Sequence, residues 1–452
     1  MKNITTASLL LLSLAAGSAS AKVSPEKADQ LGKDLTPIGA EMAGNAAGTI
    51  PKWTGGLTSS NTEKSKDAGR PRDPSPTDKA LFDITNANLD KYKANLSAGQ
   101  LAMFKKYAGY KMPVYSTKRS AAYPDALYKK VKANATTAEL IQNGNGVANF
   151  DNVVAFPIPK NASEVIWNHM TRYRGGVAKR YITTLPVQSD GAFTTVKMSD
   201  QFVWPESLEE GRDAKKDDNV LFYYLQQITA PARLTGTALL VHETLDQVKE
   251  PRRAWIYNSG QRRVRRAPNV AYDGPGTASD GLRTADNFDM YNGAPDRYNW
   301  KLIGKKELYI PYNSYKLLDT TASYDTIVQA GHLNPDYLRY ELHRVWEVEA
   351  TLKEGFRHIY AKRTMYLDED TWGASVIDQY DGRGDLWKLS EAHNIQFHDV
   401  IVPGLVAETI HDLNSGRYLV TGLSNEEPKF MVWDLKAKRK SFTSSALRRL
   451  GK

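Results

Sequence analysis

Cysteine is absent from all 452 residues of this chain, and its absence excludes several kinds of site. No disulfide can form, and no metal can be held by thiolates. A lipid anchor of the bacterial lipoprotein type is excluded as well, because such an anchor is attached to an N-terminal cysteine. An exported protein without cysteine fits a bacterial periplasm better than a eukaryotic secretory route.

Long hydrophobic runs are also absent beyond the first residues. The apolar stretch from Leu9 to Ala16 is too short to span a membrane. It follows the charged Lys2 and precedes Ala19-Ser20-Ala21, which is a small-x-small cleavage pattern. We therefore expect residues 1–21 to be a cleaved signal peptide and the mature protein to be periplasmic, with peripheral contact at the outer membrane as a further prediction.

A strong excess of one charge is lacking too. The formal net charge is +9, from 60 Lys and Arg residues against 51 Asp and Glu residues. So mild an excess in an exported chain argues against nucleic acid as a partner, but it leaves contact with an anionic membrane surface open.

Motifs for catalysis, cofactors and metals are missing or incomplete. The segment 242–246 lacks the second histidine of a zinc-protease motif, and 274–276 lacks the spacing of a nucleotide-binding loop. Glu347 and Glu349 share one face of a predicted strand and could perform acid–base chemistry on a sugar, although alternation alone accounts for them and favours a solvated face. We expect no metal, no cofactor and no enzymatic activity, with a carboxylate-based envelope hydrolase as the least favoured alternative.

The first part of the mature chain is rich in residues that break regular structure. Repeated Gly and Pro residues over 22–75 predict an extended N-terminal arm and linker. Helix starts are expected at Ser75-Pro76 and at Ser97, which has capping-box spacing to Gln100. A third helix is expected from Ser163 to Tyr173. The helices at 77–110 and 163–174 are candidates for a mobile lid.

Beyond residue 180 the pattern alternates with period two, and turn residues interrupt it. The segment 340–352 is the clearest strand, with apolar residues on one face and Glu341, His343, Glu347 and Glu349 on the other. Repeated long antiparallel strands predict one large, strongly curved sheet or a barrel. Further strands are expected at 193–203, 220–230, 236–246, 253–258, 306–311, 358–367, 373–381 and 417–423.

An arginine-rich hairpin is expected from Ala254 to Arg266, with a turn at Asn258-Ser259-Gly260. Two interpretations of its arginines stay open. They could hold an anionic headgroup or dock a membrane or partner, or they could pair with carboxylates of neighbouring strands. The arginines are Arg262, Arg263, Arg265 and Arg266.

Large apolar side chains on the predicted strands are candidates for lining a hydrophobic ligand. Packing in a closed core would produce the same pattern, so both interpretations stay open. The candidates are Trp255, Tyr257, Tyr309, Leu342, Trp346 and Val348.

Several sequence segments together resemble those of an uncharacterised family of exported Gram-negative proteins. This family is described as outer-membrane lipoprotein-sorting-like. The resemblance spans nearly the whole mature chain. It is carried by residues 34–41, 50–56, 254–273, 300–313, 339–346 and 366–372.

This family is distantly similar to periplasmic lipoprotein carriers and outer-membrane lipoprotein receptors. The resemblance implies a curved antiparallel half-barrel over residues 76–452, mainly β (α+β), with helices covering its concave side and acyl chains held beneath them. It also implies an inner-membrane exporter of the resistance–nodulation–division type and an outer-membrane β-barrel protein as partners. The sequence therefore predicts a periplasmic carrier for a hydrophobic or lipid-like molecule, with an adaptor that bridges exporter and outer-membrane partner without cargo as the alternative.

Overall fold

The structure, a computed structural model, describes residues 22–450 except 68, 268, 269 and 271. The predicted signal peptide lies outside the described residues. None of the helices in the described part of the chain is long and apolar enough to cross a membrane.

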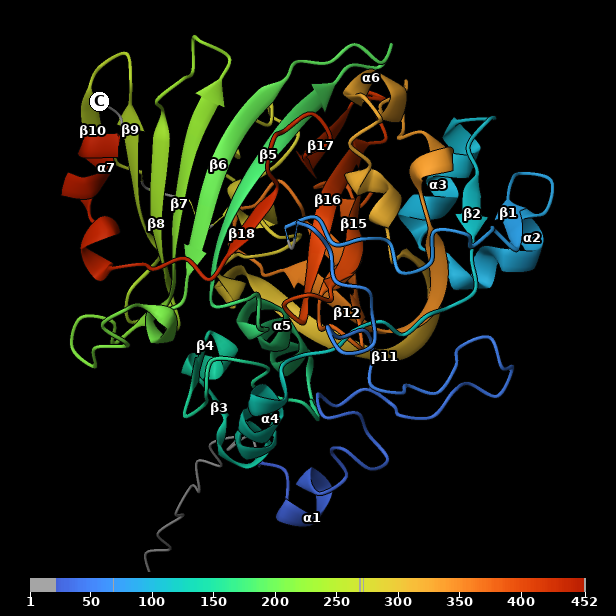
Figure 1. Ribbon diagram of the computed structural model, residues 1–452, viewed down its shortest axis with the longest axis horizontal. Coiled ribbons are helices and arrows are strands. Elements are labelled where there is room, and N and C mark those ends of the chain that lie inside the picture. Colours follow the sequence, from blue (N-terminus) through green and yellow to red (C-terminus); the bar gives the residue numbers. More distant parts are fainter. Residues whose placement is uncertain (1–21, 68, 268–269, 271, 451–452) are drawn as a thin grey trace, which may run out of the picture.

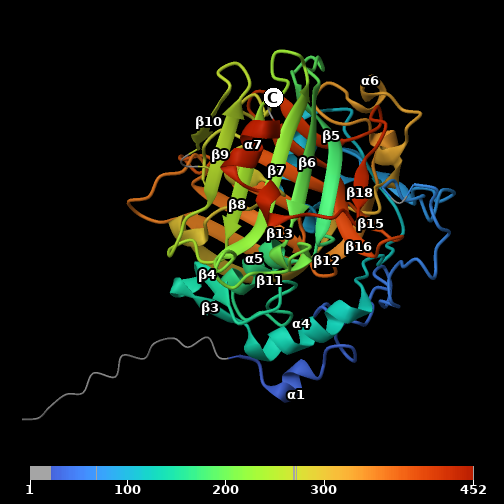
Figure 2. The same ribbon diagram turned by 60° about the vertical axis from the view of Figure 1, so that its left-hand side comes forward.

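One sheet dominates the molecule (Figure 1). Its 16 strands are antiparallel neighbours except at β2 and β12, which pair in parallel. Along the sheet the order is β1-β2-β12-β13-β14-β15-β16-β17-β5-β6-β7-β8-β9-β10, while β11 pairs with β12 and β18 with β5. The sheet is bent and unclosed, so the predicted mainly β, curved antiparallel architecture is confirmed (Figures 1 and 2).

Several strand bounds follow from the alternating pattern of the sequence. Three predicted strands agree with β7, β9 and β12 residue for residue. The strands are β1 (Phe82–Ile84), β2 (Met112–Val114), β3 (Glu139–Ile141), β4 (Gly146–Ala148), β5 (Val177–Val187), β6 (Val196–Val203), β7 (Val220–Ala230), β8 (Ala238–Thr244), β9 (Arg253–Asn258), β10 (Arg263–Arg266), β11 (Tyr298–Pro311), β12 (Tyr340–Leu352), β13 (Lys362–Asp368), β14 (Ala374–Tyr380), β15 (Leu386–Phe397), β16 (Val402–Asp412), β17 (Tyr418–Leu423) and β18 (Met431–Trp433).

Helices are few and short. Ser97 and Gln100 form the expected capping box at the start of α3. The helix predicted to start at Ser75 is wrong, because the chain enters the sheet as β1 before a short α2. The α-helices are α1 (Pro25–Ala28), α2 (Leu89–Tyr92), α3 (Ala98–Lys106), α4 (Asp125–Thr137), α5 (Ala162–Thr171), α6 (Tyr324–Ile327) and α7 (Ser444–Leu450).

These helices cover both faces of the sheet. On the face that carries Val348 and Ala392, α5 packs against β11 and β12, and its Trp167 belongs to the same hydrophobic cluster. The opposite face meets α3, where the Gln100 side chain donates a hydrogen bond to Glu391 over 2.9 Å. We call the α5 side the inner face and the α3 side the outer face.

Segment 22–75 contains one short helix and otherwise irregular structure, and it lies against the rest of the chain. The indole N–H of Trp372 donates to the carbonyl oxygen of Ile38 over 2.9 Å, and Trp53 donates to Ala121 over the same distance. Lys305 on β11 forms a 2.8 Å ion pair with Glu41. The segment is therefore tied to the sheet by buried and half-buried contacts along its length.

Candidate functional site

The inner face of β5 to β9 carries two kinds of side chain in adjacent rows. Residues that are directly paired across antiparallel strands point to the same face. One row begins with Arg180, Asp200 and Gln226 and ends with the apolar Leu239 and Ile256. The neighbouring row is aromatic and aliphatic throughout, with Ala178, Phe202, Tyr224, Val241 and Ala254.

Two adjoining cavities lie over these rows. The first extends from β5 and β6 toward β16 and β17, and the second extends toward β8 and β9. They share the side chains of Tyr224, Gln226, Arg283 and Phe288. Their volumes are about 80 Å³ and 110 Å³, so each has room for only a few water molecules as the chain stands.

Aromatic rings form the wall between the cavities. The ring centroid of Phe288 lies 5.0 Å from that of Tyr224 and 5.6 Å from that of Phe202. Arg174 lies over Phe222 and Trp204, with its guanidinium carbon 5.0 Å and 5.1 Å from the ring centroids. The wall is therefore apolar in surface but bordered by cationic groups.

Segment 272–294, here called the lid segment, covers this part of the inner face. It lies within the connection between β10 and β11, and it supplies Arg283 and Phe288 to both cavities. The sequence indicates only a long polar loop here, and the predicted lid helices lie elsewhere. Alternation and helical periodicity carry no signal for an irregular segment that packs against a sheet.

Buried ion pairs hold the lid segment. Asp289 accepts from Arg172 over 2.6 Å and from Arg174 over 2.5 Å, and all three side chains are largely buried. Asp286 accepts from Arg363 on β13 over 2.5 Å. Burial alone would raise the pKa of both carboxyl groups, but the arginines hold each pKa well below its ordinary value.

Two further contacts hold the lid backbone. The backbone N–H of Met290 donates to Glu408 on β16 over 2.7 Å. His169 of α5 places Nε2 2.9 Å from the carbonyl oxygens of both Asp289 and Tyr291, so Nε2 must carry a proton. Burial lowers the pKa of His169 to about 3, which keeps the ring neutral. Burial, reinforced by Asp289, raises the pKa of Glu408 to about 7.

The six predicted lining residues lie outside these two cavities. Trp255 and Tyr257 belong to a cluster with Leu447 of α7 on the outer face. Tyr309 and Leu342 belong to the large core cluster. Trp346 and Val348 pack in the cluster of α5, where Trp346 stacks on Trp372 with ring centroids 6.1 Å apart. As ligand-lining residues all six stay a prediction, and the geometry favours other side chains.

The predicted arginine cluster lies on the edge strand β10 and the turn before it. All four guanidinium groups are exposed. Across the part of the chain that the structure describes, none of them forms an ion pair, so pairing with neighbouring strands does not explain the cluster. We call Arg262, Arg263, Arg265 and Arg266 the basic edge.

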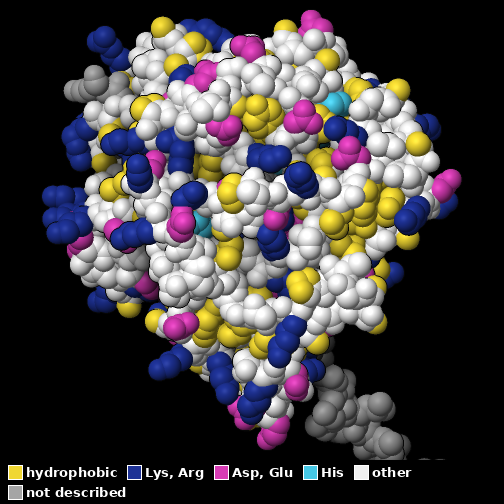
Figure 3. Space-filling model, turned by 45° about the vertical axis from the view of Figure 1, so that its right-hand side comes forward, with side chains coloured by type: hydrophobic (Ala, Val, Ile, Leu, Met, Phe, Trp, Pro, Cys, Tyr) yellow, Lys and Arg dark blue, Asp and Glu magenta, His cyan; other side chains and the backbone are white. Residues whose placement is uncertain are grey.

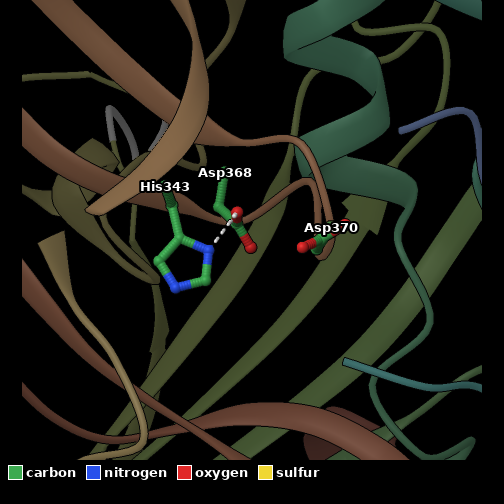
Figure 4. A group of neighbouring side chains, drawn as sticks. All are labelled: His343, Asp368 and Asp370. Atoms are coloured by element: carbon green, nitrogen blue, oxygen red, sulfur yellow. Dashed lines mark ion pairs between the residues drawn. The ribbon is translucent and has the colours of Figure 1, made fainter. Parts of the chain in front are cut away.

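A second polar group lies between the arm and the sheet, where His343, Asp368 and Asp370 place ligand atoms within 4.8 Å of one another (Figure 4). The guanidinium group of Arg119 donates hydrogen bonds to both carboxylate oxygens of Asp370, over 2.6 Å and 2.8 Å. Thr371 donates to one oxygen of Asp368, and the other lies 4.0 Å from Nδ1 of His343. Few atoms are thus left to bind a metal, which needs about four ligands in a structural zinc site.

Charges are closely balanced in this cluster. Burial, together with Asp370, raises the pKa of Asp368 to about 7. Burial would lower the pKa of His343, but hydrogen bonding to Glu341 and the charge of Asp368 raise it above its ordinary value. The prediction that Glu341 and His343 lie on a solvated face is wrong, because the 117–120 segment and the arm cover that part of β12.

A family described as "Protein of unknown function (DUF1329)" matches residues 83–448. The chain belongs to this family. An uncharacterized protein of Pseudomonas aeruginosa is 56% identical over 444 residues, which cover 98% of this chain and 97% of the relative. The family resemblance predicted from the sequence is confirmed.

Solved structures resemble the DUF1329 chain over part of its length. A Vibrio parahaemolyticus domain described as an outer membrane lipoprotein-sorting protein has a TM-score of 0.44 and 15% identity, and covers 63% of this chain and 97% of that one. A DUF1329 family protein from Desulfovibrio piger has a TM-score of 0.42 and 15% identity, with 60% and 92% covered. A LolA superfamily protein from Nitrosomonas europaea has a TM-score of 0.37 and 14% identity, with 63% and 98% covered.

Proposed function

We propose that this DUF1329 protein is a periplasmic carrier that binds a hydrophobic or amphipathic, lipid-like molecule between the inner face and the lid segment. The observation that carries the proposal is the pair of adjoining cavities with an aromatic wall. Burial of each methylene group of such a ligand contributes about 0.8 kcal/mol. The protein then acts by sequestration, and no catalytic group is required.

Binding of a lipid-sized molecule requires the lid segment to move. Ligand pockets usually measure about 300–1,000 Å³, whereas the two cavities together are much smaller. The lid segment is the covering element with no regular strand or long helix of its own. Its ion pairs at Asp286 and Asp289 are discrete contacts that can break and reform, so the described state corresponds to a closed carrier.

Replacing Leu239 with tryptophan tests this site. Leu239 lies on β8, lines the second cavity and is half-buried, so an indole there occupies ligand space. We expect the affinity for a fluorescent fatty acid to fall about tenfold, the equivalent of two methylene groups that can no longer be buried. The measurement is a fluorescence titration of the purified protein, together with mass spectrometry of molecules extracted from it by organic solvent.

The matched control is Leu81→Trp, the same change at a side chain that is 66% exposed and far from both cavities. It should bind the probe like the wild type. If the wild-type protein binds no fluorescent fatty acid and repeatedly yields no apolar molecule on extraction, the carrier function is wrong.

The basic edge supports a second proposal, that the carrier docks on an anionic membrane surface. On the face in Figure 3, acidic and basic side chains lie side by side. On β10, by contrast, arginines stand without acidic partners among the described residues. An arginine near an anionic bilayer contributes about 1 kcal/mol. Charge on an edge strand also prevents pairing with other sheets, and both roles are compatible.

Sedimentation with vesicles of anionic lipid tests this docking. The double variant Arg263→Gln/Arg265→Gln should bind about thirtyfold more weakly than the wild type at low salt, and the difference should shrink as salt is added. Its control is Lys129→Gln/Lys130→Gln, which removes two exposed charges from α4. Equal loss in both variants would mean that overall charge, and not the basic edge, drives binding.

Partners in the envelope belong to the same proposal. The family resemblance supports an exporter of the resistance–nodulation–division type and an outer-membrane β-barrel protein, and the basic edge offers a docking surface. The adaptor alternative predicts that such a partner binds while no cargo does. Hydrolase chemistry has less support, because Glu349 is paired with Lys362 at 2.9 Å and neither it nor Glu347 lines the two cavities.

A further inference from the structure

One cation in the cavity wall lacks an acidic partner. Among the cavity's arginines, Arg172 and Arg174 are paired with Asp289, and Arg180 is paired with Asp200 over 2.7 Å. Arg283 has no carboxylate within ion-pair distance among the described residues. Its guanidinium makes one weak hydrogen bond, from Nη2 to the carbonyl oxygen of Thr277 at 3.4 Å.

The position of Arg283 is central, since it lines both cavities and is half-buried. A guanidinium is always charged at physiological pH, and carboxylate and phosphate groups are the partners that match its donor geometry. An unpaired guanidinium next to an aromatic wall therefore suits a ligand in which an anionic group is attached to an apolar chain.

Gln226 provides an independent observation at the same place. It lines both cavities and is only 5% exposed. Its amide nitrogen donates to the hydroxyl of Tyr224 over 2.8 Å, while its carbonyl oxygen Oε1 is buried without a hydrogen-bond partner. A buried acceptor left unpaired costs about 1–3 kcal/mol, which a ligand that donates a hydrogen bond would recover.

We propose that Arg283 and Gln226 form a headgroup site for an anionic amphiphile, whose apolar chain lies along Phe288 and Tyr224. The inference rests on the carrier function and names the chemical class of its ligand: a carboxylate or phosphate on an aliphatic chain. Arg283 donates to the anionic oxygens, and Oε1 of Gln226 accepts from a hydroxyl when the headgroup carries one, as a singly ionised phosphate does. Glu408 also lines the first cavity, and because burial raises its pKa to about 7 its carboxyl group is only partly ionised near neutral pH.

The test uses three probes with the same twelve-carbon chain: laurate, dodecyl phosphate and dodecanol. Each displaces a fluorescent fatty acid from the full-length mature protein. For Arg283→Gln we expect the affinity for laurate or dodecyl phosphate to fall about tenfold to hundredfold, the value of a hydrogen bond to a charged group. The affinity for dodecanol should change less than threefold. The anion whose affinity falls more in Arg283→Gln identifies the chemistry of the headgroup.

The matched control is Arg383→Gln, the same substitution at a side chain that is 78% exposed and outside both cavities, which should leave all three affinities unchanged. Arg283→Lys keeps the charge and should retain more anion affinity than Arg283→Gln. Equal binding of laurate and dodecanol to the wild type, or an equal effect of Arg283→Gln on both, would overturn the headgroup site while leaving the carrier intact. Failure of all three probes to bind the wild type would overturn the carrier function itself.

Discussion

Replacing Arg119 with methionine is expected to lower the free energy of unfolding by about 3–5 kcal/mol. The Arg119 side chain is 2% exposed and bonds both oxygens of Asp370, with Glu369 3.5 Å away. Methionine fills similar space but leaves the Asp370 carboxylate buried next to Asp368 without its cation, whereas Glu369 keeps its ion pairs with Lys305 and Arg344. The cost comes from the uncompensated charge that remains, since an intact buried pair contributes much less.

Urea denaturation of the wild type and variant measures this loss. Arg383→Met is the control, because Arg383 pairs with Asp381 at the surface and its side chain is 78% exposed, so its loss should change stability by less than about 0.5 kcal/mol. Arg119 also donates to the carbonyl oxygens of Met42 and Pro51. Hydrogen exchange in 42–53 should therefore accelerate in Arg119→Met. If Arg119→Met lowered the free energy of unfolding as little as Arg383→Met does, the stabilising role given to Arg119 would be wrong.

Replacing Asp289 with asparagine is expected to cost a similar 3–5 kcal/mol and to release the lid segment. The change is nearly isosteric, but it leaves the guanidinium groups of Arg172 and Arg174 buried without an anion. Because these arginines hold the pKa of Asp289 well below its ordinary value, the pair is fully stabilising above about pH 4. Its contribution is lost as pH falls through the native pKa, so the difference between variant and wild type should shrink under acid conditions.

Hydrogen exchange over 285–292 separates local release from global unfolding, since the lid amides should lose protection before those of β6 and β7. Asp90→Asn, at a surface pair with a 95% exposed carboxylate, serves as the control and should leave both stability and lid exchange unchanged. Under the carrier proposal the released lid should also speed uptake of a fluorescent fatty acid. Wild-type protection of the lid amides in Asp289→Asn would show that these ion pairs do not hold it.

Period-two alternation predicted the bounds of β12, whose apolar and polar side chains alternate along the strand. The same rule failed for β15 and β16, whose residues are buried on both faces and therefore do not alternate. It also misplaced Glu341 and His343: polar residues on a strand indicate solvent only if nothing covers them. The arm and the 117–120 segment cover them here, and no local sequence pattern predicts contacts between segments so far apart in the chain.

The residues that line the two cavities were harder to predict from the sequence than the fold was. Large apolar residues such as Trp255 were natural candidates for a ligand wall, yet α7 covers them on the outer face. Which face of a strand points inward depends on the register of the whole sheet. Arg283 stood out in no motif, and its significance comes from what surrounds it in space: an aromatic wall, an unpaired amide oxygen and, among the described residues, no carboxylate within ion-pair distance.

The pairing of β17 with β5 has a consequence for how the chain folds. Tyr418 lies opposite Val187, so the two halves of the sheet join through residues that are far apart in the sequence. Until β17 has been synthesised, β5 is an open edge with its backbone groups free to pair with another chain. Contacts of such long sequence separation form slowly, and partly folded chains of this size tend to aggregate. A chaperone that shields the β5 edge would therefore raise the yield of folded protein, most of all at high expression.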